Sequence, residues 1–236
     1  MARIKQFGSR PPVTKKPAKK IKTRKARAKN QDRWFLKLFE NHLSFTKPWT
    51  TKGVFYPSML GNLCDKYLYL AYNGELPDQV IEAKTARIFD VGSSLEVRMK
   101  RYFERMGIFM AAEQSVKLAT PPISGRYDFL LRHEEYDTVI VELKSINELG
   151  FDALIDEPKS EHLVQLQIYL NLANIEHGIV LYENKNDQKL KAFKVIRNEQ
   201  VWENILERCL RIQNMQPLEV PTECNGEFFC LCRRKK

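Results

Sequence analysis

The sequence contains no long apolar run. None of its hydrophobic stretches approaches the roughly 20 residues that a membrane-spanning helix requires. The first residues also lack the apolar core of a secretory signal peptide. From these two absences we expect a cytoplasmic protein with no membrane partner.

Cysteine is scarce, with five residues in a chain of 236. Disulfides persist in secreted proteins and are rare where thiols are kept reduced, so the missing secretion signal predicts free thiols or metal ligands. A chain of this length can bury a substantial core, and one folded domain with appendages is the natural count.

Acidic residues are absent from residues 1–30, which hold 12 of the 39 Lys and Arg residues. The remaining 27 basic residues face all 29 acids, so the body from residue 31 has a formal charge of −2, against +10 for the whole chain. With three prolines and few apolar residues, this segment is predicted to be a disordered basic tail. Such a tail attracts nucleic acid regardless of sequence, but a localisation signal or a solubility tail fits the same composition.

Two neighbouring runs in the middle of the chain predict a β-hairpin. Residues 125–132 and 138–146 are rich in apolar and β-branched residues, and the polar residues between them predict a turn. Side chains alternate along a strand, so Glu142 and Lys144 share one face while their neighbours enter a core. Asp128 on the first strand is expected to lie beside them.

The chemistry of these three side chains indicates a metal site. Two charged residues in an otherwise apolar strand need a compensating partner. Asp128 and Glu142 supply oxygen ligands of the kind that Mg²⁺ prefers, and Lys144 could orient or deprotonate a water. The set suits attack of water on a phosphodiester. The alternative is a surface hairpin whose exposed face carries an ordinary Glu–Lys pair.

This stretch resembles the PD-(D/E)XK nuclease superfamily, and within it the RecB-like branch that includes CRISPR-associated and phage exonucleases. The catalytic positions of that family fall on Asp128, Glu142 and Lys144. The resemblance covers about residues 55–232. It departs from the family's name at one position, because Tyr127 rather than proline precedes Asp128.

The resemblance implies roles for three further residues. Gln165 and Tyr169 match the family's Gln-x-x-x-Tyr motif, which contacts the nucleic acid or the active site, and one helical turn puts them on the same face. The family often has Gly-x-x-x-His in an earlier helix, with the histidine reaching the metal. Here Gly92-Ser-Ser-Leu-Glu96 places Glu96 at the histidine position, as an additional metal ligand. The alternative for Glu96 is an ordinary exposed glutamate.

The cysteines follow the family's layout with a different spacing. RecB-like nucleases carry one early cysteine and three late ones, which together bind an iron–sulfur cluster. Cys64 matches the early position, and Cys224, Cys230 and Cys232 match the late ones, with Cys209 expected outside the site. The spacing is Cys-x5-Cys-x-Cys, whereas the family's is closer to Cys-x2-Cys-x5-Cys. The resemblance implies a 4Fe-4S cluster, and four thiolates would also suit tetrahedral zinc; no metal at all stays open.

The remaining periodicities complete an α/β pattern. Helices are predicted over residues 32–43, 55–74, 85–106, 161–174 and 198–214, and further strands over 114–119, 178–183 and 189–197. The first helix is amphipathic and is expected to pack onto the body, with a partner-binding helix as the alternative. This order predicts a small mixed β-sheet flanked by helices, a restriction-endonuclease-like core.

These expectations converge on a Mg²⁺- or Mn²⁺-dependent deoxyribonuclease. We expect a disordered tail over residues 1–30 and a nuclease domain over 31–236, whose cysteine-rich C-terminal segment closes onto the helix that bears Cys64.

The expected activity is exonucleolytic processing of DNA ends in recombination, repair or phage DNA metabolism. A structure-specific endonuclease and a non-catalytic DNA-end-binding recombination partner stay open. No helicase motif is present, so any unwinding would come from a helicase or recombination protein as partner. The expected location is the cytoplasm of a bacterial or phage-infected cell, or the nucleus if the source is eukaryotic.

Deleting residues 1–30 tests the basic tail. We expect weaker DNA binding with a shallower dependence of affinity on salt, because fewer phosphates are neutralised. The turnover of bound DNA should not change. Binding titrations at several salt concentrations measure both effects, and an unchanged salt slope would assign the tail to localisation or solubility.

Overall fold

The fold is built on a five-stranded mixed sheet. The computed structural model describes residues 32–50, 52–224 and 230–233, so the predicted basic tail lies outside the described residues. The strands lie side by side in chain order, and only β5 and β6 are parallel. The strands are β3 (Phe109–Leu118), β4 (Ile123–His133), β5 (Asp137–Ile146), β6 (His177–Asn184) and β7 (Leu190–Ile196). The predicted hairpin is β4–β5, and the predicted fold class is confirmed.

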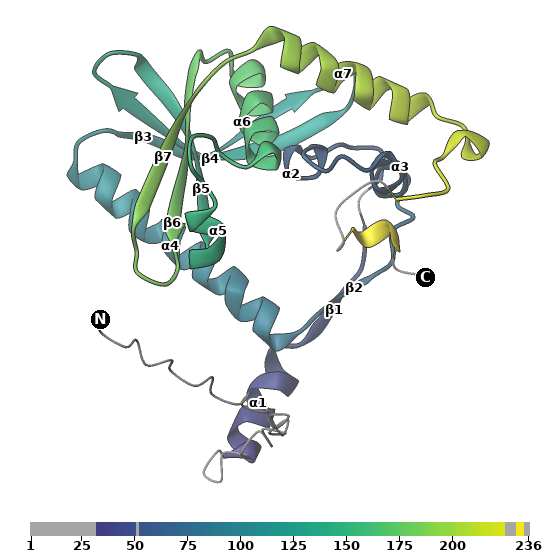
Figure 1. The fold of residues 1–236 in the computed structure, drawn as a ribbon, viewed down its shortest axis with the longest axis horizontal. Helices are drawn as coiled ribbons and strands as arrows, with labels where there is room; N and C mark the ends of the chain where they lie inside the picture. The colour runs from purple at the N-terminus through teal and green to yellow at the C-terminus, as the bar shows by residue number, and fades with distance from the viewer. Residues whose placement is uncertain (1–31, 51, 225–229, 234–236) are drawn as a thin grey trace, which may run out of the picture.

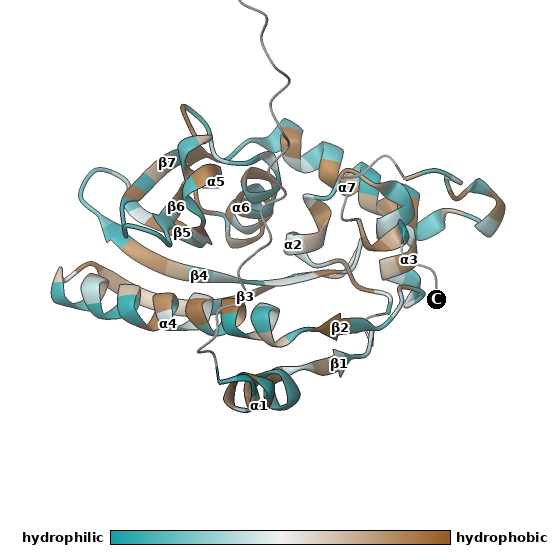
Figure 2. Cartoon of the chain, turned by 60° about the horizontal axis from the view of Figure 1, so that its bottom comes forward, coloured by the Kyte–Doolittle hydropathy of each residue, from teal (hydrophilic) through white to brown (hydrophobic). Residues whose placement is uncertain are grey.

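Helices cover both faces of the sheet (Figure 2). The alternation of β5 divides its apolar side chains between them. Val139, Val141 and Leu143 pack with α4 (Ala83–Arg105), whereas Ile140 packs with α6 (Ser160–Ala173). Because both faces are covered, the carboxylate of Glu142 is removed from water along with its apolar neighbours.

A further apolar cluster lies beside the sheet (Figure 1), and in it three more helices join Ile168 of α6 and Ile123 of β4. These are α2 (Pro57–Leu60), α3 (Asp65–Asn73) and α7 (Glu199–Asn214). Helix α2 packs closely against α6. Three other short helices lie elsewhere in the chain order: α5 (Glu148–Asp152) follows β5, and η1 (Pro217–Glu219) and η2 (Leu231–Arg233) follow α7.

The first described helix forms as predicted, and it contacts α4 of the body without burying any of its own residues. Helix α1 (Arg33–Leu43) begins after Asp32, whose side chain accepts a hydrogen bond from the Phe35 amide. None of its residues is buried, and Trp34 is 70% exposed. A two-stranded sheet of β1 (Phe45–Lys47) and β2 (Gln79–Ile81) follows it (Figure 1). Among the described residues, no helix is both long and apolar enough to cross a membrane.

The helix predicted over residues 55–74 is broken into two. Helix α2 ends at Leu60, and α3 begins only at Asp65, with Cys64 as its N-cap. The Asn62 side chain accepts a hydrogen bond from the Cys64 amide at 2.8 Å and so stabilises the break. Gly74 ends α3 in the left-handed conformation, which glycine adopts without a steric penalty. The N-cap of α2 is Tyr56.

The long helix predicted over residues 85–106 is only partly buried in the structure, where it is α4. Leu95, Met99 and Phe103 of α4 enter the core, whereas Ile88 and Met106 are exposed. The C-terminal half of α4 therefore packs against the sheet. Strand β3 begins five residues earlier than the predicted strand, at Phe109 rather than residue 114.

Gly61 marks the contact between α2 and α6 and generates a prediction. A Cβ added there would lie 2.6 Å from the Glu161 Cα, although the backbone of Gly61 is in the ordinary helical region. We expect Gly61→Ala to lower the free energy of unfolding by about 1–3 kcal/mol, because two backbones must separate.

Gly92 provides the matched control. A Cβ there meets nothing within 4 Å, and the residue lies inside α4. Gly92→Ala should raise stability by about 0.5–1 kcal/mol, since alanine favours the helix. Chemical denaturation measures both variants, and equal effects would contradict the close contact at Gly61.

Candidate functional site

The site begins where β4 and β5 stop pairing. Their register ends with Phe129 opposite Val141, so the next pair, Asp128 and Glu142, lies just beyond the ladder. Instead of a β4 carbonyl, the Asp128 side chain accepts the Leu143 amide at 2.7 Å. The hairpin thus places two carboxylates next to each other at the point where backbone pairing ends.

Glu142 is the most deeply buried charged residue of this site. It is 1% exposed, and its Oε1 lies 2.7 Å from the Lys144 Nζ. Its Oε2 is buried and has no hydrogen-bond partner among the described residues. Burial, and after it the charge of Asp128, raises the pKa of Glu142 to about 8, against the attraction of Lys144. The second oxygen therefore lacks the electropositive partner that its burial requires.

Helix α6 holds Lys144 from the other side. The Lys144 Nζ donates to the Gln165 Oε1 at 3.1 Å, and the Gln165 Nε2 donates to the Tyr169 Oη at 3.3 Å. Gln165 and Tyr169 are both buried, and burial raises the pKa of Tyr169. The structure thus brings together five of the predicted residues, with the ammonium of Lys144 between a carboxylate and an amide oxygen.

Glu96 reaches the same neighbourhood from α4. It lines a pocket of about 380 Å³ together with Asp128 and Glu113. Burial, followed by the negative charges of Asp128 and Glu113, raises the pKa of Glu96. Glu96 and Asp128 therefore share a pocket, and Glu142 lies one strand away. Among the described residues, these carboxylates do not form a group of ligand atoms as close as that of the cysteines.

Glu113 is a site residue that the sequence did not indicate. It lies in β3, between residues that pair with Phe129 and Tyr127, and its backbone has a positive φ of 52°. This conformation is strained for a residue other than glycine, and such strain is often found next to functional sites. Its carboxylate pairs with Arg126 at 2.9 Å, and both side chains are more than half exposed. No local pattern marks this residue, because its place opposite Asp128 follows from the pairing of β3 with β4.

His162 is a second residue that sequence reasoning missed. It lies one turn before Gln165 on α6, and its Nδ1 is 2.7 Å from the Tyr182 Oη. Tyr182 is fully buried and accepts the Lys159 amide, and its own proton has an acceptor when the His162 Nδ1 is unprotonated. The neutral ring then carries its own proton on Nε2. Burial, together with the nearby Lys144 and Lys159, lowers the pKa of His162 to about 3, which keeps the ring neutral.

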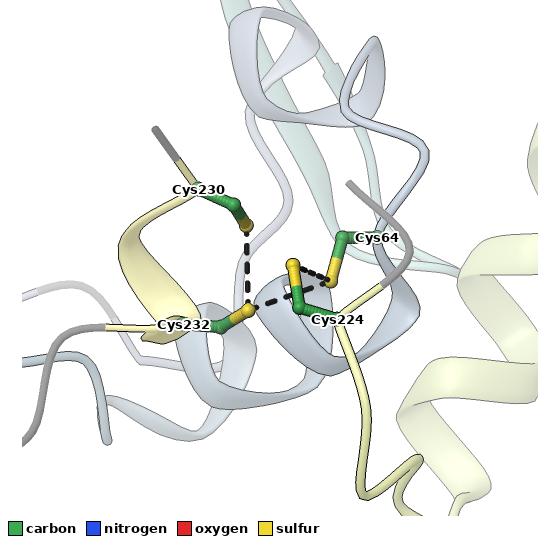
Figure 3. A group of neighbouring side chains, drawn as sticks. All are labelled: Cys64, Cys224, Cys230 and Cys232. Carbon is green, nitrogen blue, oxygen red and sulfur yellow. Dashed lines mark hydrogen bonds between the residues drawn. The ribbon is translucent and has the colours of Figure 1, made fainter. Parts of the chain in front are cut away.

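The four predicted cysteines also lie together (Figure 3). The Cys64 Sγ is 3.6 Å from the Sγ atoms of Cys224 and Cys232, and the latter is 3.4 Å from the Cys230 Sγ. All four sulfurs lie within 4.8 Å of one another. Cys64 caps α3 rather than lying within a helix, which corrects the sequence-based expectation. Cys209 is buried in the cluster of α2, α3 and α7, away from this group.

Comparison with known proteins gives likeness of fold alone. No family model matches the chain, and no curated protein matches its sequence. Among solved structures, an alkaline exonuclease from Laribacter hongkongensis has a TM-score of 0.50 at 15% identity, over 68% of this chain and 86% of the other. The protein SSO0001 gives 0.47 at 21% identity, over 76% and 84%. A phage-related exonuclease from Haemophilus somnus 129PT gives 0.41 at 14% identity, over 52% and 67%.

The buried Glu142 predicts a pH dependence of stability in metal-free protein. Its pKa is raised from 4.5 to about 8, so the folded state holds a proton that the unfolded state releases. This contribution is complete below pH 4.5 and is lost as pH rises toward 8, at a cost on the order of 5 kcal/mol. Glu142→Gln should flatten this slope in denaturation curves recorded with EDTA.

Glu135→Gln is the control, because Glu135 is exposed in the turn of the same hairpin. Its slope should equal that of the unchanged protein. If Glu142→Gln also leaves the slope unchanged, Glu142 does not hold a proton in this range.

Proposed function

We propose that this chain is a metal-dependent deoxyribonuclease of the PD-(D/E)XK superfamily. The observation that carries the proposal is the unpartnered, buried Glu142 Oε2 beside Asp128, with Lys144 on the other oxygen. An ordinary Glu–Lys pair on a wet surface would not bury an oxygen without a partner. The likeness in fold to an alkaline exonuclease supports the proposal.

The donor set suits a hard divalent cation. Mg²⁺ and Mn²⁺ prefer carboxylate and carbonyl oxygens, and Mg²⁺ uses one or two carboxylates while it keeps several waters. Asp128 and Glu142 would hold the ion, with Glu96 joining from α4 directly or through a water. When bound, such an ion polarises the phosphate and lowers the pKa of a water.

The other residues position the reactants. Lys144 would hold the attacking water and take part in its deprotonation, and Gln165 fixes the direction of the ammonium through a hydrogen bond backed by Tyr169. His162 would offer its Nε2–H to a phosphate oxygen, as a neutral donor of fixed tautomer. Arg126 lies at the exposed edge of the site and could exchange Glu113 for a phosphate, because an exposed ion pair is weak.

We infer an exonuclease that acts on DNA ends in recombination, repair or phage DNA metabolism. Support for the exonuclease comes from the likeness in fold to the alkaline exonuclease from Laribacter hongkongensis and from the sequence motifs. DNA is thus the proposed partner. A helicase or recombination protein would supply any unwinding.

Cleavage of end-labelled DNA tests the proposal. Single- and double-stranded substrates are incubated with Mg²⁺, Mn²⁺ or EDTA. We expect metal-dependent release of nucleotides, and a loss of at least about 100-fold in Asp128→Ala, Glu142→Ala and Lys144→Ala, because each removes transition-state stabilisation. Internal cuts would indicate the endonuclease instead.

Two controls separate chemistry from folding. Glu135→Gln should cleave normally, and circular dichroism should show that the inactive variants are folded.

His162→Gln keeps a donor and an acceptor and should stay more active than His162→Phe, which keeps neither. Full activity in Asp128→Ala or Lys144→Ala would overturn the site assignment, and DNA binding without any cleavage would favour the non-catalytic end-binding protein.

A further inference from the structure

The four-cysteine group joins segments that are far apart in the chain. Cys64 lies in the break between α2 and α3, Cys224 follows η1, and Cys230 and Cys232 belong to the segment around η2 (Figure 3). The sequence separation between Cys64 and Cys224 is 160 residues. Thiols do not otherwise attract one another strongly, so their convergence points to a shared ligand.

The spacing of the sulfurs measures the size of that ligand. Three of the sulfur–sulfur distances are 3.4–3.6 Å, and no pair of the four sulfurs is more than 4.8 Å apart. These distances are far longer than the S–S bond of about 2.05 Å, which excludes disulfides. Four sulfurs arranged tetrahedrally around one zinc ion, each at about 2.3 Å, lie about 3.8 Å from one another.

A four-iron cluster does not fit this spacing. In such a cluster each thiolate binds a different iron, so two metal–sulfur bonds and the distance between two irons separate any pair of thiolates. The thiolates then lie much farther apart than around a single ion. We propose that Cys64, Cys224, Cys230 and Cys232 hold one structural zinc ion, and not the 4Fe-4S cluster that the family resemblance implies.

Neighbouring groups suit a single anionic site. Zinc with four thiolates carries a net charge of −2, which hydrogen-bond donors must offset. The Tyr67 amide donates to the Cys64 Sγ at 3.3 Å, and the Asn62 Nδ2 lies 3.9 Å from the Cys230 Sγ. Asn62 thus touches two ligands, because its Oδ1 also accepts the Cys64 amide.

The zinc would fasten the C-terminal segment to the support of the nuclease site. Arg208 of α7 binds the carbonyls of Leu60 and Asn62 and pairs with Asp65, so the loop before Cys64 is already fixed to the core. The same α2 segment meets α6 at Gly61. Pro57 of α2 contacts Gly125, which lies three residues before Asp128. The ion would therefore stiffen the base on which β4 and α6 rest, without touching DNA.

The metal content of the full chain tests the proposal. The protein is expressed with both iron and zinc supplied and is purified without oxygen. We expect one zinc per chain, no acid-labile sulfide and no colour. Zinc X-ray absorption should show a single shell of four sulfur ligands at about 2.3 Å. None of these measurements requires cleavage of DNA, so they remain decisive if the proposed nuclease function fails.

Variants localise the ion. Cys64→Ser and Cys232→Ser should lose the zinc and unfold at a lower temperature, whereas Cys209→Ala should keep it, because Cys209 lies outside the group. If the serine variants do not fold, the absorption spectrum of the unchanged protein still decides the ligand set. Four irons with labile sulfide and broad absorbance near roughly 400 nm, a zinc shell with fewer than four sulfurs, or protein without metal would each overturn the proposal.

Discussion

The rest of the site depends on the burial of one carboxylate. Glu142 has almost no contact with water, and a lone ionised carboxylate in such a place is too costly to persist. Lys144 reduces the cost on one oxygen, and its own position requires Gln165 on α6. The pairing of β4 with β5 must end before Asp128, so that a second carboxylate can stand beside the first. Strand pairing, helix placement and charge are therefore arranged around a single unpaired oxygen.

The sequence is sufficient to predict those helices and strands in which the hydrophobic periodicity agrees with the observed burial. The alternation around Glu142 and Lys144 gave the correct faces of β5, because both faces of that strand are covered. The sequence predicts the start of α6 within one residue of its observed start at Ser160. Gln165 and Tyr169 contact each other, as the helical repeat requires. The convergence of the distant cysteines came from the resemblance in layout rather than from any local pattern.

Periodicity does not predict the local structure where a side-chain hydrogen bond or the pairing of two strands decides it. The apolar pattern over residues 55–74 continues through Leu63, yet Leu63 is 71% exposed, because Asn62 turns the chain there. Glu113 looks like any surface glutamate in the sequence, and only the pairing of β3 with β4 brings it opposite Asp128. The amphipathic pattern of α1 predicts a helix but not its surroundings, because such a pattern does not say what covers the apolar face.

The long separation between Cys64 and the other three ligands has a consequence for biosynthesis. The ribosome makes the sheet, α6 and α7 before it makes Cys224, so the hydrophobic core can form while the ligand set is still incomplete. Closing a loop of 160 residues in an unfolded chain costs entropy, whereas a folded core already holds Cys64 and the base of the C-terminal segment close together. Loading of an ion would then come last, as a step that reports that the domain has folded.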